Sequence, residues 1–151
     1  GSDIHYYETG RIGTQVVEAV AQLATAVPIR VDALAHDDPS DFVDAVEAFI
    51  QSIHTNTSGD SIYDPIMGEM RVCTSGIPVG TGGTPPTEDY FEIVEPGNSV
   101  CFDIIPRTNT TISATSVPLV FNATIDVIGD LHTPLDTRQV VFVVPPEIPG
   151  G

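Results

Sequence analysis

The sequence predicts an α+β fold in which a small αβα segment is followed by an antiparallel β-sandwich. In the first third of the chain, apolar residues recur at helical spacing on both sides of one short alternating segment. Farther along, apolar and polar residues alternate, and clusters of Gly and Pro separate the alternating segments. Short alternating strands joined by such turns are typical of a β-sandwich.

The first predicted element is an amphipathic helix from Thr14 to Ala26. Its apolar residues recur at helical spacing until Pro28 ends the pattern, and they are Val16, Val17, Val20, Leu23 and Ala24. Residues 29–34 alternate apolar and polar side chains, which predicts a short strand. Since a strand needs neighbours for its backbone groups, three arrangements are open. Residues 4–7 pair with it, or the segment docks on the sandwich, or another chain completes the sheet.

A second helix is predicted after residues 38–41, whose sequence Asp-Pro-Ser-Asp is typical of a helix start. Asp38 is the expected N-cap. The apolar residues that follow lie on one helical face, which we expect to be buried; they are Phe42, Ala45, Val46, Phe49, Ile50 and Ile53. Residues 54–61 are polar and predict a hinge. This hinge divides the chain into an αβα segment at 3–55 and a sandwich at 62–147.

The sandwich is predicted from five segments with a period of two. These segments cover residues 70–73, 90–94, 100–104, 120–127 and 138–144. Turn clusters lie between them, and the run from Gly80 to Gly83 is expected to be a flexible loop, because a phosphate-binding loop would need a lysine and a following helix. We therefore expect the later part of the chain to form short antiparallel strands.

Composition limits the classes of function. With 151 residues and 41% hydrophobic residues, the chain is long enough for a substantial core, and no apolar run approaches the roughly 18–20 residues of a membrane-spanning helix. The formal net charge is −16, and all five basic residues are arginines. Such a field repels nucleic acid and anionic lipid, so we expect neither nucleic-acid binding nor membrane insertion. The absence of lysine excludes lysine-based covalent catalysis.

The two cysteines, Cys73 and Cys101, are too few for a disulfide framework and have no CxxC spacing. They can form one bridge or remain as reduced core residues. We predict the bridge, because closing a loop of this length stabilises a fold by roughly 3–4 kcal/mol in the chain-entropy model.

Parts of the sequence resemble a known family. Residues 24–31 (ATAVPIRV), 37–41 (DDPSD) and 43–50 (VDAVEAFI) look like the closing helix, strand and helix of von Willebrand factor A (VWA) domains in bacterial surface proteins. Residues 101–111 (CFDIIPRTNTT) and 142–146 (FVVPP) resemble the immunoglobulin-like β domain that can follow them. The resemblance implies a C-terminal VWA remnant, an immunoglobulin-like sandwich, and an extracellular or cell-envelope location.

The metal site of that family is not carried over. It begins with Asp-x-Ser-x-Ser, and the nearest sequence here, residues 38–42, has Phe42 at the fifth position. The resemblance therefore implies a fold and a location, with no metal ligand. What precedes Asp3 in a parent protein is not given by the sequence.

No cofactor is predicted, although two groups of acidic residues could bind a hard cation such as calcium. One group is Asp37, Asp38, Asp41 and Asp44, for which helix capping is the favoured explanation. The other is Asp126, Asp130 and Asp136 around a predicted turn, for which solvated turn residues are the favoured explanation.

No catalytic residue is predicted. The four histidines lie near the ends of predicted elements or in loops, outside any known nucleophile or zinc motif; they are His5, His36, His54 and His132. The sequence thus predicts a non-catalytic spacer or adhesion module of a secreted or envelope protein, which contacts a protein partner or the rest of its parent chain. A calcium-dependent binding module and a hydrolase with a spatially assembled His/Asp site are the alternatives. The oligomeric state is left open.

Overall fold

The computed structural model describes residues 4–8, 15–22, 28–64 and 67–147. Its one described helix is α1 (Ala45–Phe49), so within these ranges no helix is long and apolar enough to cross a membrane. The strands are β1 (Ile4–Glu8), β2 (Gln15–Gln22), β3 (Ile29–Asp37), β4 (Ile50–Asn56), β5 (Ser61–Asp64), β6 (Glu69–Val72), β7 (Val79–Thr81), β8 (Asp89–Val94), β9 (Ser99–Pro106), β10 (Leu119–Gly129) and β11 (Thr133–Val144).

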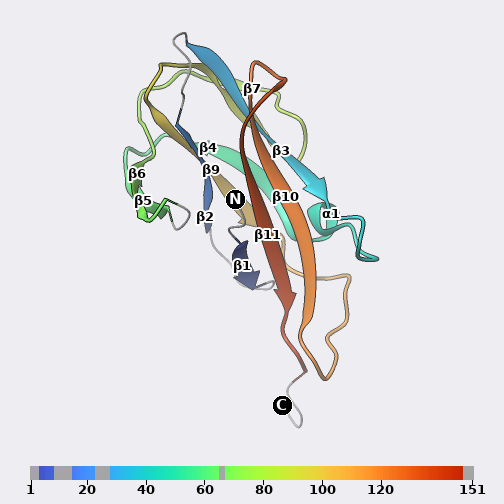
Figure 1. Cartoon of the computed structure of the whole chain (residues 1–151). Helices are drawn as coiled ribbons and strands as arrows, with labels where there is room; N and C mark the ends of the chain where they lie inside the picture. The colour runs from blue at the N-terminus through green and yellow to red at the C-terminus, as the bar shows by residue number, and fades with distance from the viewer. Residues whose placement is uncertain (1–3, 9–14, 23–27, 65–66, 148–151) are drawn as a thin grey trace.

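The strands form two larger sheets and a hairpin (Figure 1). The larger sheet has the order β1-β11-β10-β3-β8-β7, and the smaller one has the order β2-β9-β4. All pairings between neighbouring strands are antiparallel except that of β1 with β11, which is parallel. The hairpin consists of β5 and β6. The antiparallel β architecture expected for the later part of the chain is confirmed.

The core lies between the two larger sheets. Phe91 of β8 and Phe102 of β9 meet edge to face across it, with ring centroids 5.2 Å apart. At another part of the core, α1 inserts Phe49 between Phe121 and Phe142, at centroid distances of 5.5 and 5.4 Å. Along β10 every second residue from Phe121 to Gly129 is buried, which is the alternation of a strand with one face on a core.

The predicted helix at 14–26 is wrong over its described part, because residues 15–22 form strand β2. Leu23, Ala24 and the rest of that prediction lie outside the described residues. Three of the eight residues of β2 are valine, and β-branched side chains favour strands over helices when a partner strand is available. Strand β9 is that partner, with Val17 opposite Phe102.

The predicted second helix is shortened to five residues. Asp44, in place of Asp38, is the N-cap, and its side chain accepts hydrogen bonds from the backbone N–H groups of Val46 and Glu47. The chain leaves the helix at Ile50 and continues as β4, which pairs with β9. Of the predicted buried face, Phe49 and Ile53 are fully buried, whereas Phe42 is 86% exposed. The described residues therefore do not form the expected αβα segment, and the VWA remnant is not supported.

Strands from both sides of the predicted hinge share the same sheets. Strand β3 lies between β10 and β8, and β4 pairs with β9. The segment at 3–55 is thus not separated from the segment at 62–147, and residues 54–56 belong to β4. Residues 4–8 pair with β11, and not with residues 29–34 as one alternative had it. Strand β3 is completed by the sandwich itself.

The β5–β6 hairpin is held to the body by a disulfide and by buried ion pairs. Cys73 and Cys101 form the predicted disulfide, and Ile62 packs against it. Asp64, only 1% exposed, lies 3.5 Å from Nη2 of the buried Arg138 and 3.7 Å from Nε of Arg71. Disulfides persist in oxidising environments, so the bridge indicates an oxidising environment for this chain.

The predicted loop at Gly80 to Gly83 begins within strand β7. Gly80 lies opposite Tyr90 of β8, and a Cβ atom at Gly80 would overlap the Tyr90 ring. Arg30 lies over this ring, with its guanidinium carbon 3.5 Å from the ring centroid. Glycine is therefore needed at this position because the strand packs closely against Tyr90, and not because a loop must be flexible here.

Candidate functional site

One of the four histidines lies in a polar cluster. His54 and Ser52 lie on the same face of β4, and the Nε2 atom of His54 is 3.1 Å from the Ser52 hydroxyl. The same Nε2 atom is 3.4 Å from a carboxylate oxygen of Glu88. Glu88 is positioned there because its backbone N–H donates to the carbonyl of Ile53, at 2.9 Å.

This cluster contains the residue types of a catalytic triad without the geometry of one. In a triad, one ring nitrogen of the histidine faces the nucleophile while the other donates to the acid. Here Ser52 and Glu88 both approach Nε2 of His54. Glu88 therefore cannot orient the His54 ring for proton transfer from Ser52. We accordingly do not assign Ser52 as a nucleophile.

Asp103 faces the same side of the sheet, directly opposite His54 in the register of β4 and β9. Burial raises the pKa of its carboxyl group, whereas a 3.1 Å hydrogen bond from the Asn56 amide and the nearby His54 act to lower it. Because burial is the largest effect, Asp103 binds its proton more tightly in the folded chain than in the unfolded chain.

Replacing Asp103 tests the raised pKa of its carboxyl group, because the shift makes the stability of the fold depend on pH. Since the folded pKa of Asp103 is raised, its contribution to stability is present below the unfolded pKa and is lost as pH rises through the folded pKa. Asp103→Asn removes this loss and can keep the bond to Asn56. We expect the variant to have a higher melting temperature than the parent at pH 7, with the difference shrinking toward pH 3 in thermal scans. A difference that grows on acidification would contradict the raised pKa.

His36 and His132 have partners outside this cluster. The Nε2 atom of His36 is 3.1 Å from Asp126, and the Nδ1 atom of His132 is 2.6 Å from the backbone carbonyl of Asp130. His5 lies on β1, whose side chains are outside the described part of the chain.

The three candidate calcium ligands each have a different partner. Asp126 accepts a hydrogen bond from Thr137, Asp130 accepts one from the backbone N–H of Arg30, and Asp136 pairs with Arg138 at 2.7 Å. Within the described ranges, no group of three or more His, Cys, Asp or Glu side chains converges as metal ligands. These carboxylates thus bond to side chains and backbone groups of the sheet and its turns.

The acidic run before α1 is explained by backbone hydrogen bonds. Asp37 accepts from the N–H of Ala45, and Asp41 accepts from Asn122 of β10. Asp38 accepts from Ser40, which lowers the pKa of its carboxyl group, and Asp44 caps the helix. The N-cap is therefore Asp44 and not the expected Asp38, and Asp37 also bonds an N–H at the start of the helix, whereas Asp38 and Asp41 bond backbone groups outside it.

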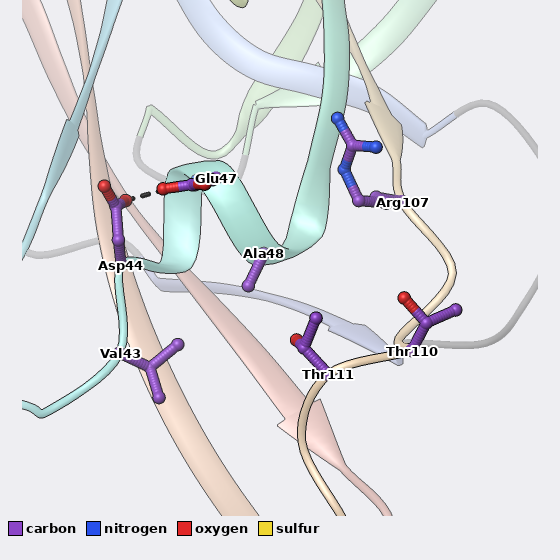
Figure 2. Close-up of a pocket in the computed structure, with 7 residues that line it drawn as sticks. All are labelled: Val43, Asp44, Glu47, Ala48, Arg107, Thr110 and Thr111. Atoms are coloured by element: carbon purple, nitrogen blue, oxygen red, sulfur yellow. Dashed lines mark hydrogen bonds between the residues drawn. The ribbon is translucent and has the colours of Figure 1, made fainter.

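A pocket of about 430 Å³ lies between α1 and the segment that follows β9 (Figure 2). Its helical side carries two carboxylates and an alanine, and its other side carries a guanidinium and two threonines. The lining residues are Val43, Asp44, Glu47, Ala48, Arg107, Thr110 and Thr111. Volumes of this order accommodate small organic ligands.

Hydrogen bonds fix both walls of the pocket. The backbone N–H of Arg107 donates to the carbonyl of Phe49 at 2.7 Å, which joins the two walls at one end. In the threonine wall, the Asn109 side chain accepts from the N–H groups of Thr111 and Ile112 and donates to the carbonyl of Ile112. The pocket is thus formed by the fold and needs no rearrangement to present its polar groups.

Sequence reasoning did not select this pocket. Its two walls are far apart in the chain, and neither contains a catalytic or binding motif. Arg107 was the one available signal, because an arginine in a chain with 21 acidic residues is expected to pair with one of them. Within the described ranges its guanidinium makes no ion pair and no hydrogen bond.

Comparison with known proteins gives distant similarity to solved structures. No family model and no curated protein matches the chain. A solved structure of a family 123 glycoside hydrolase from Clostridium perfringens, studied for glycolipid glycan hydrolysis, is similar with a TM-score of 0.45 and 11% sequence identity. The match covers 97% of this chain and 23% of that one. This chain thus spans less than a quarter of that protein's length.

This comparison corrects one expectation. The sequence predicted that the chain is not an enzyme, whereas the similar structure is that of a glycoside hydrolase. We therefore withdraw that prediction. A similarity at this TM-score assigns no activity, substrate or catalytic residue to this chain.

Proposed function

We propose that this chain is a structural spacer module of a secreted or cell-envelope protein, and that it carries tension along its parent chain. The observation that carries this proposal is the parallel pairing of β1 with β11, in which Ile4 lies opposite Gln139 and Glu8 lies opposite Val143. The immunoglobulin-like kind of sandwich, which the sequence resembles, belongs to the same proposal. The rest of the parent chain is the proposed partner.

Parallel pairing determines how force reaches the hydrogen bonds. The beginning of β1 and the end of β11 lie at opposite ends of the pair, because the two strands run in the same direction. A pull on these two ends slides one strand along the other and loads all their hydrogen bonds together. A pull that peels β1 from one end would break the same bonds one after another. The first geometry resists force better.

Force spectroscopy tests the proposal. In one geometry, handles are attached at the two ends of the chain; in the other, at the N-terminal end and at Leu131, an exposed residue of the β10–β11 turn. The second pair of handles peels β1 from its Ile4 end. We expect an unfolding force several times lower in the second geometry. Equal forces in the two geometries would overturn the proposed role.

The disulfide gives this experiment an internal measure of length. Cys73 and Cys101 are separated by 28 residues, so the bridge hides roughly 90–100 Å of extended chain from the pull. We expect a double variant, Cys73→Ser with Cys101→Ser, to lengthen on unfolding by that amount more than the parent. Its free energy of unfolding should fall by about 2–4 kcal/mol in chemical denaturation. An unchanged length would show that the cysteines are not bridged in solution.

A further inference from the structure

We propose that the pocket between α1 and residues 107–111 binds a neutral polyhydroxylated ligand, that is, a sugar unit with adjacent hydroxyl groups. This inference is independent of the spacer role. It rests on side chains of opposite charge that line one pocket and form no ion pair with each other.

The first step concerns the partners of the charged groups. Arg30, Arg71 and Arg138 each form an ion pair with a carboxylate, at 2.7 to 3.7 Å. Arg107 differs from them, and so does Glu47 in the opposite wall, because neither side chain has a polar partner among the residues that the structure describes. The two side chains line one pocket and form no ion pair with each other.

The second step concerns the chemistry that fills the gap. The Glu47 carboxylate accepts hydrogen bonds, and so does the second oxygen of Asp44, whose first oxygen caps the helix. The Arg107 guanidinium donates, and the hydroxyls of Thr110 and Thr111 can do both. Hydroxyl groups complement all of these at once, since each donates one hydrogen bond and accepts others. Val43 and Ala48 add apolar surface, against which the C–H face of a sugar ring can pack.

The third step excludes charged ligands as the best fit. A free anion would approach a chain of net charge −16, and it would meet the carboxylates of Asp44 and Glu47 beside Arg107. A simple cation would be attracted by Asp44 and Glu47 but would give the Arg107 guanidinium no hydrogen-bond acceptor. A neutral ligand incurs neither penalty, and the hydrogen bonds to ionised groups are the stronger kind. The prearranged walls reduce the ordering cost of binding.

The test is an NMR titration of the whole chain with methyl glycosides of several common hexoses and N-acetylhexosamines, and with short oligosaccharides built from them. We expect at least one of them to shift the backbone amide signals of Ala48, Thr110 and Thr111 in a saturable manner. A preference for oligosaccharides over the matching methyl glycoside would identify a glycan chain as the source. Glycine and inorganic phosphate serve as the zwitterion and anion probes, and saturation by either without any sugar would overturn the ligand class.

Matched variants separate this site from general surface effects. Glu47→Gln and Arg107→Gln should each weaken the binding at least about tenfold, which corresponds to losing one hydrogen bond to a charged group. Glu92→Gln removes the same charge from an exposed position on β8, outside the pocket, and should leave the affinity unchanged. An equal loss in all three variants, or no saturable shift with any sugar, would overturn the inference. Neither result bears on the unfolding force.

Discussion

Phe49→Ala is expected to lower the free energy of unfolding by about 3–5 kcal/mol, measured by urea denaturation. Phe49 has no exposed surface, and its ring contacts those of Phe121 on β10 and Phe142 on β11. Truncation leaves a cavity whose walls belong to two paired strands, which limits their ability to close it. The helix that carries Phe49 has only five residues, which is too short to be stable by helix propensity alone. Packing of the Phe49 ring therefore holds the helix in position.

Phe42→Ala is the matched control. Phe42 is 86% exposed, although its ring touches the edge of Phe121 at a centroid distance of 5.7 Å. We expect its replacement to change the free energy of unfolding by less than about 1 kcal/mol. Similar losses for the two variants would contradict the structure and restore the single buried helix face that the sequence predicted.

Asp64→Ala is expected to cost about 3–5 kcal/mol, because it removes one side of a buried ion cluster. The carboxylate of Asp64 lies between the guanidinium groups of Arg138 and Arg71, and the side chains of Asp64 and Arg138 are 2% and 3% exposed. Without Asp64, the buried Arg138 keeps its charge and loses a compensating one. The β5–β6 hairpin would also lose its electrostatic link to β11.

Glu69→Gln removes an exposed charge from the same cluster and serves as the control. Its carboxylate lies 2.9 Å from Arg71 and is 54% exposed, so solvent weakens the interaction. We expect a loss of less than about 1 kcal/mol, which shrinks further in high salt. The loss for Asp64→Ala should persist in the same salt series. A small or salt-sensitive loss at Asp64 would mean that water reaches the cluster.

The strands with alternating apolar and polar residues were predicted well, because this alternation is visible within a few residues of sequence. The apolar side of β10, the cysteine-containing strand β9 and the valine-rich strand β11 all lie where alternation placed them. The disulfide was also predictable, since the chain has only two cysteines. Strand β7 was missed because glycine carries no pattern, and its role depends on the Tyr90 ring next to it.

The first predicted helix and the end of the second form strands for a common reason. Segments such as residues 15–22 and 50–56 contain apolar residues that fit helical spacing and β-branched residues that fit a strand. Strand β9 offers an edge on each side, and β2 and β4 occupy them. Hydrogen bonding to a partner 45 or more residues away thus outweighed the local preference.

By itself the sequence determined the β-rich later part of the chain, the disulfide and the strongly acidic composition. These follow from side-chain types and from spacing within a few residues. Only the tertiary structure decided the state of the first third, the burial of Asp64 with two arginines, and the pocket that joins α1 to residues 107–111. The physical reason is that strand pairing and ion pairing depend on contacts between segments that are distant in the sequence. A pattern within a few residues does not predict such contacts.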